Sequence, residues 1–289
     1  LFRLDDHLPA ERTVPTRWNH TENIDPVVLR AVDPVVTHID LGAADLSVAR
    51  GSVIDDDAGL RQATLLVPPG TAATYTTLTG ETASLAALDV RFTEYTAGEA
   101  GPIAMPSSLP STSGFTYAVE ISVDEVLANG RKVDGKDVIL SQSVPFSLEN
   151  FLGFPVGSVV PVGYYDRDHG RWVPYPNGLV IGILGDLDSD GRAELDLTGT
   201  GQAADAAALT ARAISDDERA SLHALHEPGD SIWRVTLDHF STWDCNWPYG
   251  PEGGATRPSQ PSPKRKDPPK SNDPCDEQGS VIECETQTL

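Results

Sequence analysis

The acidic stretch DLDSDGRAELD, residues 186–196, has the residue types and spacing of a cation-binding loop. Its carboxylates alternate and Gly191 permits a sharp turn, so several oxygen atoms can converge on one calcium ion. Leu197 stands where a complete EF-hand loop has a bidentate glutamate, which predicts weak binding of the extracellular type. A solvated acidic turn is the alternative. The expected ligands are Asp186, Asp188 and Asp190, the backbone carbonyl of Arg192, and Glu194 or Asp196.

A second constellation is the tripeptide His239-Phe240-Ser241. A hydroxyl that follows a peptide carbonyl can attack it and move the acyl group from nitrogen to oxygen, if the peptide is strained and a nearby base accepts the proton. Hydrolysis of the resulting ester would cut the chain between Phe240 and Ser241. A histidine that is only packed or hydrogen-bonded within a strand is the alternative.

Other reactive side chains form weaker patterns. The chain has no G-x-S-x-G motif, which argues against a serine hydrolase of the α/β type. His223 and His226 lie about one helical turn apart and could share a metal, but no acidic triad lies near them on that helix, so an exposed helix face is expected. The three cysteines, Cys245, Cys275 and Cys284, match neither a disulfide framework nor a zinc motif.

Aromatic residues are concentrated in the second half of the chain. They could form a carbohydrate-binding platform, although Trp and Tyr in β-sandwiches also serve as core or clamp residues. The residues concerned are Tyr164, Tyr165, Trp172, Trp233, Trp243, Trp247 and Tyr249.

The composition narrows the possible partners. With 43 acidic and 21 basic residues, the net charge is -22, so nucleic acid and anionic membrane surfaces are not expected to bind. No apolar run is long enough to span a bilayer, so membrane insertion is not expected either. The acidity suits an extracellular medium with calcium. No charged-then-apolar leader opens the sequence, and a targeting signal is expected to lie elsewhere.

The elements that must position these residues are mostly β-strands. Short β-branched runs are separated by Gly, Pro and Asp turns, and the alternation over 115–123 predicts one buried face, with Glu120 and Ser122 on the wet face. Residues 203–227 favour two short helices divided near Ile214, the second with a start signal at Ser215. The predicted fold is mostly β: two β-sandwich-like domains, a small helical insertion and an extended Pro-rich C-terminal strap.

The predicted domain boundaries follow these composition changes. We expect an extended lead-in over residues 1–30 and a first β-sandwich-like domain over 31–150. A second β domain, which contains the helical insertion, covers 151–249. A Pro-rich linker over 250–274 is followed by a segment over 275–289 that leads into a plug or shell, with a strand-like run at Val281–Cys284.

Several longer phrases resemble a known family. "FLGFPVGSVVPVGYYDRDHGRWVP", "WRVTLDHFSTWDCNWPYGP" and "GSVIECETQTL" are similar to the region before the repeats in bacterial RHS, or YD-repeat, proteins, relatives of teneurins and toxin-complex shells. The resemblance covers about residues 50 to 289. It implies a secreted or cell-surface bacterial protein whose repeats form a hollow β cocoon around a C-terminal toxin or effector.

The resemblance also shapes the functional hypotheses. It implies a non-enzymatic structural or interaction module that caps, plugs or presents the shell. The partners would be the shell of the same polypeptide and other secretion or toxin-complex components. The motif His239-Phe240-Ser241 also resembles paired β-sandwiches of the ankyrin and netrin-receptor type, some of which cut themselves there. The alternatives are therefore a self-cleaving module and a calcium-dependent adhesion or glycan-binding module.

Overall fold

A computed structural model describes residues 1–247 apart from 13, 15–17, 20, 22, 25, 99, 110–113 and 132–134. The fold is mostly β, as the sequence predicts, with three α-helices among these residues. The predicted linker 250–274, the segment 275–289 and the residues Cys275, Cys284, Pro248 and Tyr249 lie outside the described residues.

The strands follow one another closely along the chain, because Gly, Pro and Asp turns separate short β-branched runs. The first half contains β1 (Thr37–Asp40), β2 (Ser47–Arg50), β3 (Ile54–Asp56), β4 (Gly59–Arg61), β5 (Thr64–Val67), β6 (Ala73–Thr77), β7 (Thr82–Leu85), β8 (Ala87–Glu94), β9 (Ala118–Val123), β10 (Gly130–Arg131) and β11 (Val138–Glu149). The second half contains β12 (Val159–Asp166), β13 (Arg171–Gly185), β14 (Glu194–Asp196), β15 (Ser231–Phe240) and β16 (Thr242–Asp244). The helices are α1 (Asp124–Asn129), α2 (Ala206–Ala211) and α3 (Asp216–Leu225), with a 3₁₀ turn at Gly101–Ala104.

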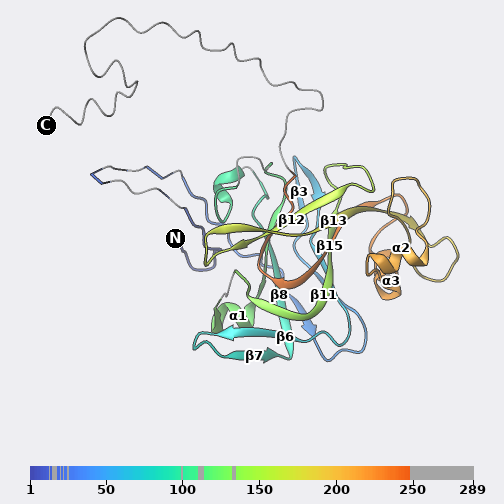
Figure 1. Cartoon of the computed structure of the whole chain (residues 1–289), viewed down its shortest axis with the longest axis horizontal. Coiled ribbons are helices and arrows are strands. Elements are labelled where there is room, and N and C mark those ends of the chain that lie inside the picture. The colour runs from blue at the N-terminus through green and yellow to red at the C-terminus, as the bar shows by residue number, and fades with distance from the viewer. Residues whose placement is uncertain are drawn as a thin grey trace, which may run out of the picture. The chain divides into compact units, whose positions relative to one another are not determined.

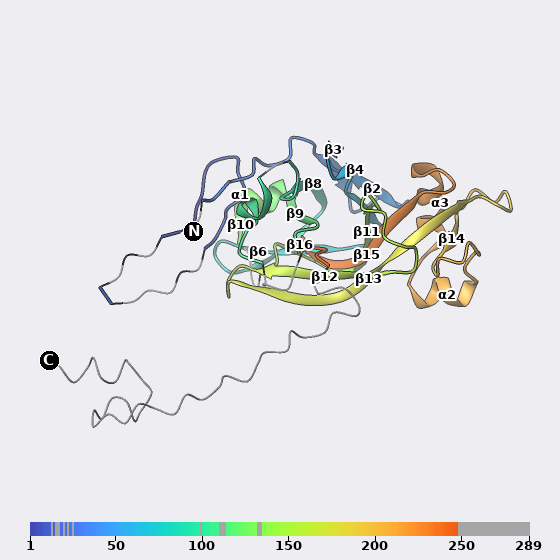
Figure 2. The same ribbon diagram turned by 90° about the horizontal axis from the view of Figure 1, so that it is seen from above.

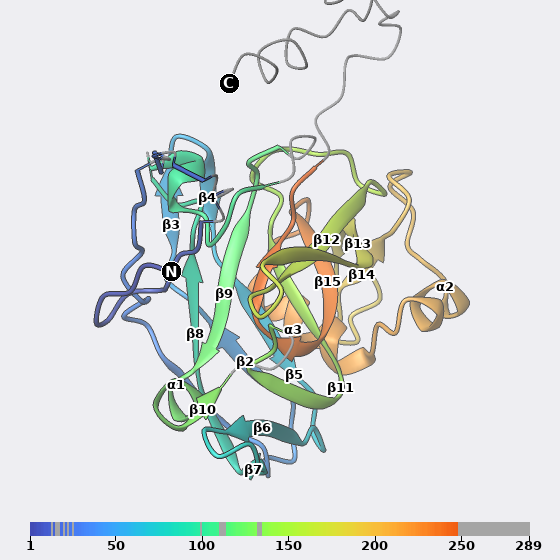
Figure 3. The same ribbon diagram turned by 60° about the vertical axis from the view of Figure 1, so that its left-hand side comes forward.

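Most strands belong to one antiparallel sheet that is nearly closed (Figures 1 and 3). Its order is β1-β8-β9-β16-β12-β13-β15-β11-β5-β2, with β6, β7 and β10 branching from β11 and β14 from β13. The two ends of this path meet through a side chain: the Thr37 hydroxyl on β1 donates to the carbonyl of Arg50 on β2 and accepts from its N–H. The path therefore encircles the main core.

The two predicted β domains contribute strands to this same sheet. β11 ends at Glu149, one residue before the predicted boundary, and pairs along its length with β15 from the second segment. Residues 1–249 form one compact unit. The predicted boundary thus falls at a turn between two strands of that unit.

The main core lies inside the curved sheet. It draws apolar residues from β1, β8, β9, β11, β12 and β15, and its largest members are Trp233 and Trp243. Trp233 also donates from Nε1 to Asn150 Oδ1 at 2.7 Å, so its polar atom is satisfied.

The outer face of β9 is buried too, which corrects the expectation of a wet face there. Glu120 is 2 % exposed and Ser122 is fully buried. The physical reason is the lead-in segment, which packs against the sheet instead of standing free: Leu8 joins a cluster with Tyr95, Met105 and Ala118. Glu120 is then surrounded by partners, with Arg167 at 3.8 Å and the hydroxyls of Thr242 and Tyr95 donating to it.

The helical insertion agrees with its prediction. α2 and α3 are separate helices on either side of Ile214, and they gather with β14 at one end of the sheet (Figure 2). The Ser215 hydroxyl accepts from Glu218 N–H at 3.1 Å and begins α3, which confirms the start signal. No helix among the described residues is long and apolar enough to cross a membrane.

Candidate functional site

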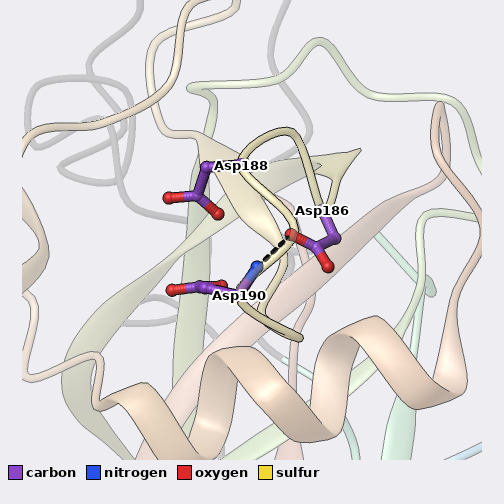
Figure 4. A group of neighbouring side chains, drawn as sticks. All are labelled: Asp186, Asp188 and Asp190. Carbon is purple, nitrogen blue, oxygen red and sulfur yellow. Dashed lines mark hydrogen bonds between the residues drawn. The ribbon is translucent and has the colours of Figure 1, made fainter.

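The acidic loop after β13 brings three of the proposed ligands together. One carboxylate oxygen from each of Asp186, Asp188 and Asp190 lies within 4.8 Å of the other two (Figure 4). Ser189 and Gly191 take left-handed backbone conformations, with φ of 64° and 81°, which turn the chain sharply enough for this convergence. The loop therefore presents a cluster of oxygens that suits a hard cation.

Local hydrogen bonds order this loop. Backbone N–H groups of Asp190 and Gly191 both donate to the Asp186 carboxylate at 3.0 Å, and Figure 4 shows the first of these contacts. Desolvation acts to raise the pKa of Asp186, but the backbone donors outweigh it and hold the pKa below its usual value. Asp186 is thus ionised and oriented at neutral pH.

The other expected ligands have different partners. Glu194 on β14 pairs with Arg219 of α3 at 2.6 Å, and Asp196 accepts from the N–H groups of Thr198, Gly199 and Gly201. The Arg192 side chain reaches Asp190 and Asp216, each at 3.2 Å. The structure therefore assembles the first three aspartates and engages Glu194 and Asp196 elsewhere.

The tripeptide His239-Phe240-Ser241 lies where β15 ends, deep in the protein. His239 is 1 % exposed, and Phe240 and Ser241 are fully buried. The imidazole ring packs among three aromatic rings, with centroid distances of 4.5 Å to Trp243, 4.8 Å to Tyr164 and 5.8 Å to Tyr175. Asp238 Oδ1 lies 2.6 Å from His239 Nδ1, which fixes the orientation of the ring.

The peptide group between Phe240 and Ser241 has features that bear on acyl transfer. The Phe240 carbonyl accepts from Asp137 N–H at 2.9 Å, which polarises it in the way an oxyanion-hole donor does. The Ser241 Oγ has no hydrogen-bond partner among the described residues. Neither residue has a positive φ. The site thus has a polarised carbonyl and a buried hydroxyl, without backbone strain of the left-handed kind.

The remaining candidates are separated by the fold. His223 is exposed near the end of α3, whereas His226 is its half-buried C-cap residue, and burial lowers the pKa of His226. Trp233, Trp243 and Tyr165 are buried in the protein, so they do not belong to an exposed aromatic platform. Cys245 is a buried free thiol, and burial raises its pKa far above the usual range, which makes it unreactive.

One polar residue of interest has no counterpart in the sequence-based predictions. Asp244, on β16, lines a pocket of about 300 Å³ on the outer side of β12 and β13. Burial raises its pKa to about 6, although Asn246 donates a hydrogen bond to it. The only sequence signal is a carboxylate in the stretch WDCNW, where large apolar neighbours indicate burial.

Comparison of the chain with family models, with curated proteins and with solved structures gives no match.

Proposed function

We propose that the chain is a non-enzymatic structural and interaction module on the N-terminal side of a secreted or surface-exported RHS shell. Its partners would be the YD-repeat shell of the same polypeptide and other secretion or toxin-complex components. Two kinds of observation support it: the resemblance of the phrases at residues 151–174 and 233–251, and the way the last described strand is anchored.

β16 lies between two strands and is bonded on both sides. It pairs with β9 on one side and β12 on the other, so it cannot peel away as an edge strand could. Trp247 follows it and stacks on Phe154 at 4.1 Å and 15°, and its carbonyl accepts from Gly114 N–H at 2.8 Å. A chain held in this way transmits force from whatever follows residue 247 into the sheet, which suits a module that carries a shell.

The test begins with the coding sequence after Leu289. We expect YD repeats there, and a sequence without them would overturn the proposal. The second step is limited proteolysis of the full polypeptide, with Trp247→Ala compared with the wild type. The variant should be cut between the module and the repeats at lower protease concentration, whereas the exposed Leu187→Ala change should leave cleavage unaltered.

A self-cleaving module is the second candidate, and the hydrogen bond from Asp137 N–H to the Phe240 carbonyl favours it. Ser241 Oγ would attack the Phe240 carbonyl carbon, the Phe240–Ser241 C–N bond would break, and His239 would carry the hydroxyl proton to the leaving amine. Water would then hydrolyse the ester to a Phe240 carboxylate and a free Ser241 amine and hydroxyl. β16 would stay in the sheet, so the fragments would separate only on denaturation.

The measurement for self-cleavage is the mass of the denatured protein over time. The hypothesis predicts two fragments, 1–240 and 241–289, that disappear in Ser241→Ala. Ser122→Ala, which removes another buried hydroxyl, is the matched control and should still be cut. A single intact wild-type mass after prolonged incubation would rule out this activity.

Calcium is proposed as a structural ion of the loop formed by Asp186, Asp188 and Asp190. The convergence of their oxygens within 4.8 Å supports this assignment. With Glu194 and Asp196 bonded elsewhere, backbone carbonyls and water would complete the six to eight oxygens that calcium takes. We expect affinity in the range of about 0.1 to 1 mM that is typical of extracellular modules.

A further inference from the structure

A pocket lies on the outer side of β12, β13 and β16. It combines aromatic and proline walls with a single carboxylate, in a volume of about 300 Å³. Pockets with mainly apolar walls and a few fixed polar groups are typical of small-ligand sites. The residues used below are Gly163, Trp172, Asp244 and Asn246.

Asn246 holds the carboxylate in one orientation. Its Oδ1 accepts from the backbone N–H groups of Thr116 at 2.8 Å and Tyr117 at 3.2 Å, which fixes the amide. Its Nδ2 then donates to Asp244 Oδ2 at 3.0 Å. The carboxylate is thus positioned before any ligand arrives, as a binding site requires.

Gly163 makes room for this carboxylate. Gly163 and Asp244 are register partners of β12 and β16, and a Cβ atom at position 163 would lie 2.6 Å from Asp244 Oδ1. That distance is shorter than any stable contact, so a side chain at this position would displace the carboxyl group. The close fit holds the carboxyl group against the β12 backbone, and both residues line the pocket.

Asp244 lacks a counter-charge within the described part of the chain. Its Oδ1 atom is buried and has no hydrogen-bond partner there, and no charged side chain acts on its pKa. Burial of an ionised carboxylate without a paired charge is costly, and such groups concentrate at functional sites. A ligand that brings a positive charge and N–H donors would remove that cost.

We propose that this pocket binds an organic cation, an alkylammonium or guanidinium group that donates hydrogen bonds to Asp244 and lies against Trp172. A charged N–H donor forms its strongest hydrogen bonds with a carboxylate, and aromatic rings attract cations. Calcium is poorly matched to this pocket, because its lining offers one carboxylate and Asn246 Oδ1 already accepts two backbone hydrogen bonds. The net charge of -22 also draws cations to the surface.

Alkylammonium and guanidinium groups occur in small organic cations and in the Lys and Arg side chains of proteins. Agmatine represents the small molecule, and N-acetyl-arginine amide represents a basic side chain with its backbone. N-acetyl-citrulline amide has nearly the same shape but no charge. This proposal is independent of the RHS shell and of self-cleavage, because Asp244 takes no part in either.

The experiment is isothermal titration of residues 1–289 with these three compounds. At least one cation should bind and the citrulline compound should not. Asp244→Asn, which keeps the shape of the side chain, should weaken binding about tenfold or more, since a charge-assisted hydrogen bond is lost. Asp45→Asn removes an equal charge from an exposed site outside the pocket and should leave binding unchanged.

A second variant changes the position of the Asp244 carboxylate without removing it. Gly163→Ala should displace the carboxylate and weaken binding while Asp244 remains present. Binding of agmatine alone would indicate a small-molecule ligand, and binding of N-acetyl-arginine amide alone would indicate a basic side chain of a protein. Either result would support the proposal. The absence of binding by both at about 10 mM, equal binding of the citrulline compound, or unchanged affinity in Asp244→Asn would each overturn it.

Discussion

β13 and β15 connect two regions that are built in different ways. Near the C-terminal end of β15, the aromatic cage of Tyr164, Tyr175 and Trp243 encloses His239, and its members come from three strands. At the opposite end lies the acidic loop 186–196 with α2 and α3, where most hydrogen bonds join residues two to five positions apart. The cage depends on long-range packing, whereas the loop depends on local polar contacts.

This difference predicts unequal sensitivity to mutation. Burial inside a nearly closed sheet makes the cage intolerant of lost volume, because the surrounding strands cannot collapse into a cavity. Exposed loop side chains contribute little to the free energy of unfolding unless they bind an ion or another ligand. Charged pairs buried between the helices and the sheet are the exception at the loop end.

The largest effect is expected in the cage. Trp243→Ala removes a side chain that is 2 % exposed and packs on His239, Tyr164 and Tyr175. We expect the free energy of unfolding to fall by about 3–5 kcal/mol, measured by urea denaturation. Leu187→Ala, at a loop position that is 67 % exposed, is the control and should change it by less than about 0.5 kcal/mol. Similar losses in both variants would invalidate the comparison.

A comparable loss is expected where α3 meets the sheet. Glu218 and Arg234 form a buried ion pair at 2.5 Å, and Arg234 also donates to the carbonyls of Arg212 and Ala213. Glu218→Ala leaves this arginine buried without its counter-charge, so the free energy of unfolding should fall by about 3–4 kcal/mol. The double variant Glu218→Leu/Arg234→Met should recover most of that loss. If the double variant does not regain the lost free energy of unfolding, the loss in Glu218→Ala comes from altered packing and not from the unpaired charge of Arg234.

Asp244 should make stability depend on pH. Its pKa of about 6 in the folded protein lies above the ordinary 3.8, so the unfolded state ionises more readily. Stability is therefore highest when the group is protonated in both states and falls as pH rises from about 4 to above 6, by on the order of 2–3 kcal/mol. Asp244→Asn should raise the melting temperature at pH 7.5 and leave it unchanged near pH 3.5. A stabilisation that is equal at both pH values would contradict this assignment.

Calcium should act on the loop region with a moderate effect. With a Kd of about 0.1 to 1 mM, about 10 mM calcium should stabilise the fold by about 1.4–2.7 kcal/mol. Differential scanning fluorimetry with calcium and with chelator measures this shift. Asp188→Asn should abolish it, whereas Asp217→Asn, an exposed acidic residue of α3, should not. An equal response to magnesium and calcium in all variants would indicate charge screening instead of a site.

The smallest effect is expected at the start of α3. Ser215→Ala removes the acceptor for Glu218 N–H and should lower the free energy of unfolding by about 1 kcal/mol. Ser221→Ala, inside the same helix, should change it by less than about 0.5 kcal/mol. If both serines prove equivalent, the capping contact does not stabilise the helix.

Features that form within a short segment of the chain could be predicted from the sequence. The acidic loop, the division of the helices near Ile214 and the cap at Ser215 depend on residues a few positions apart, and the sequence displays such patterns directly. The β character of the chain follows from its alternation and turns in the same way. Each of these features forms within one short segment.

Features that depend on distant segments could not be predicted. Glu120 and Ser122 are placed on a wet face by alternation, but the lead-in segment around Leu8 covers that face. Asp244 becomes buried because its strand pairs with Ala118 on one side and Gly163 on the other, about 126 and 81 positions earlier in the chain. No local pattern at Asp244 contains this information.

The central position of β16 has a consequence for the order of synthesis. β9 and β12 are made long before the strand that joins them, so on the ribosome the sheet keeps a gap until residue 244 and its flanking tryptophans emerge. Until then two strand edges and the apolar core side stay exposed, which makes the nascent chain prone to aggregate and dependent on chaperones. The sheet is therefore completed late, when β16 inserts between β9 and β12. A chain truncated before Thr242 should accumulate as insoluble material.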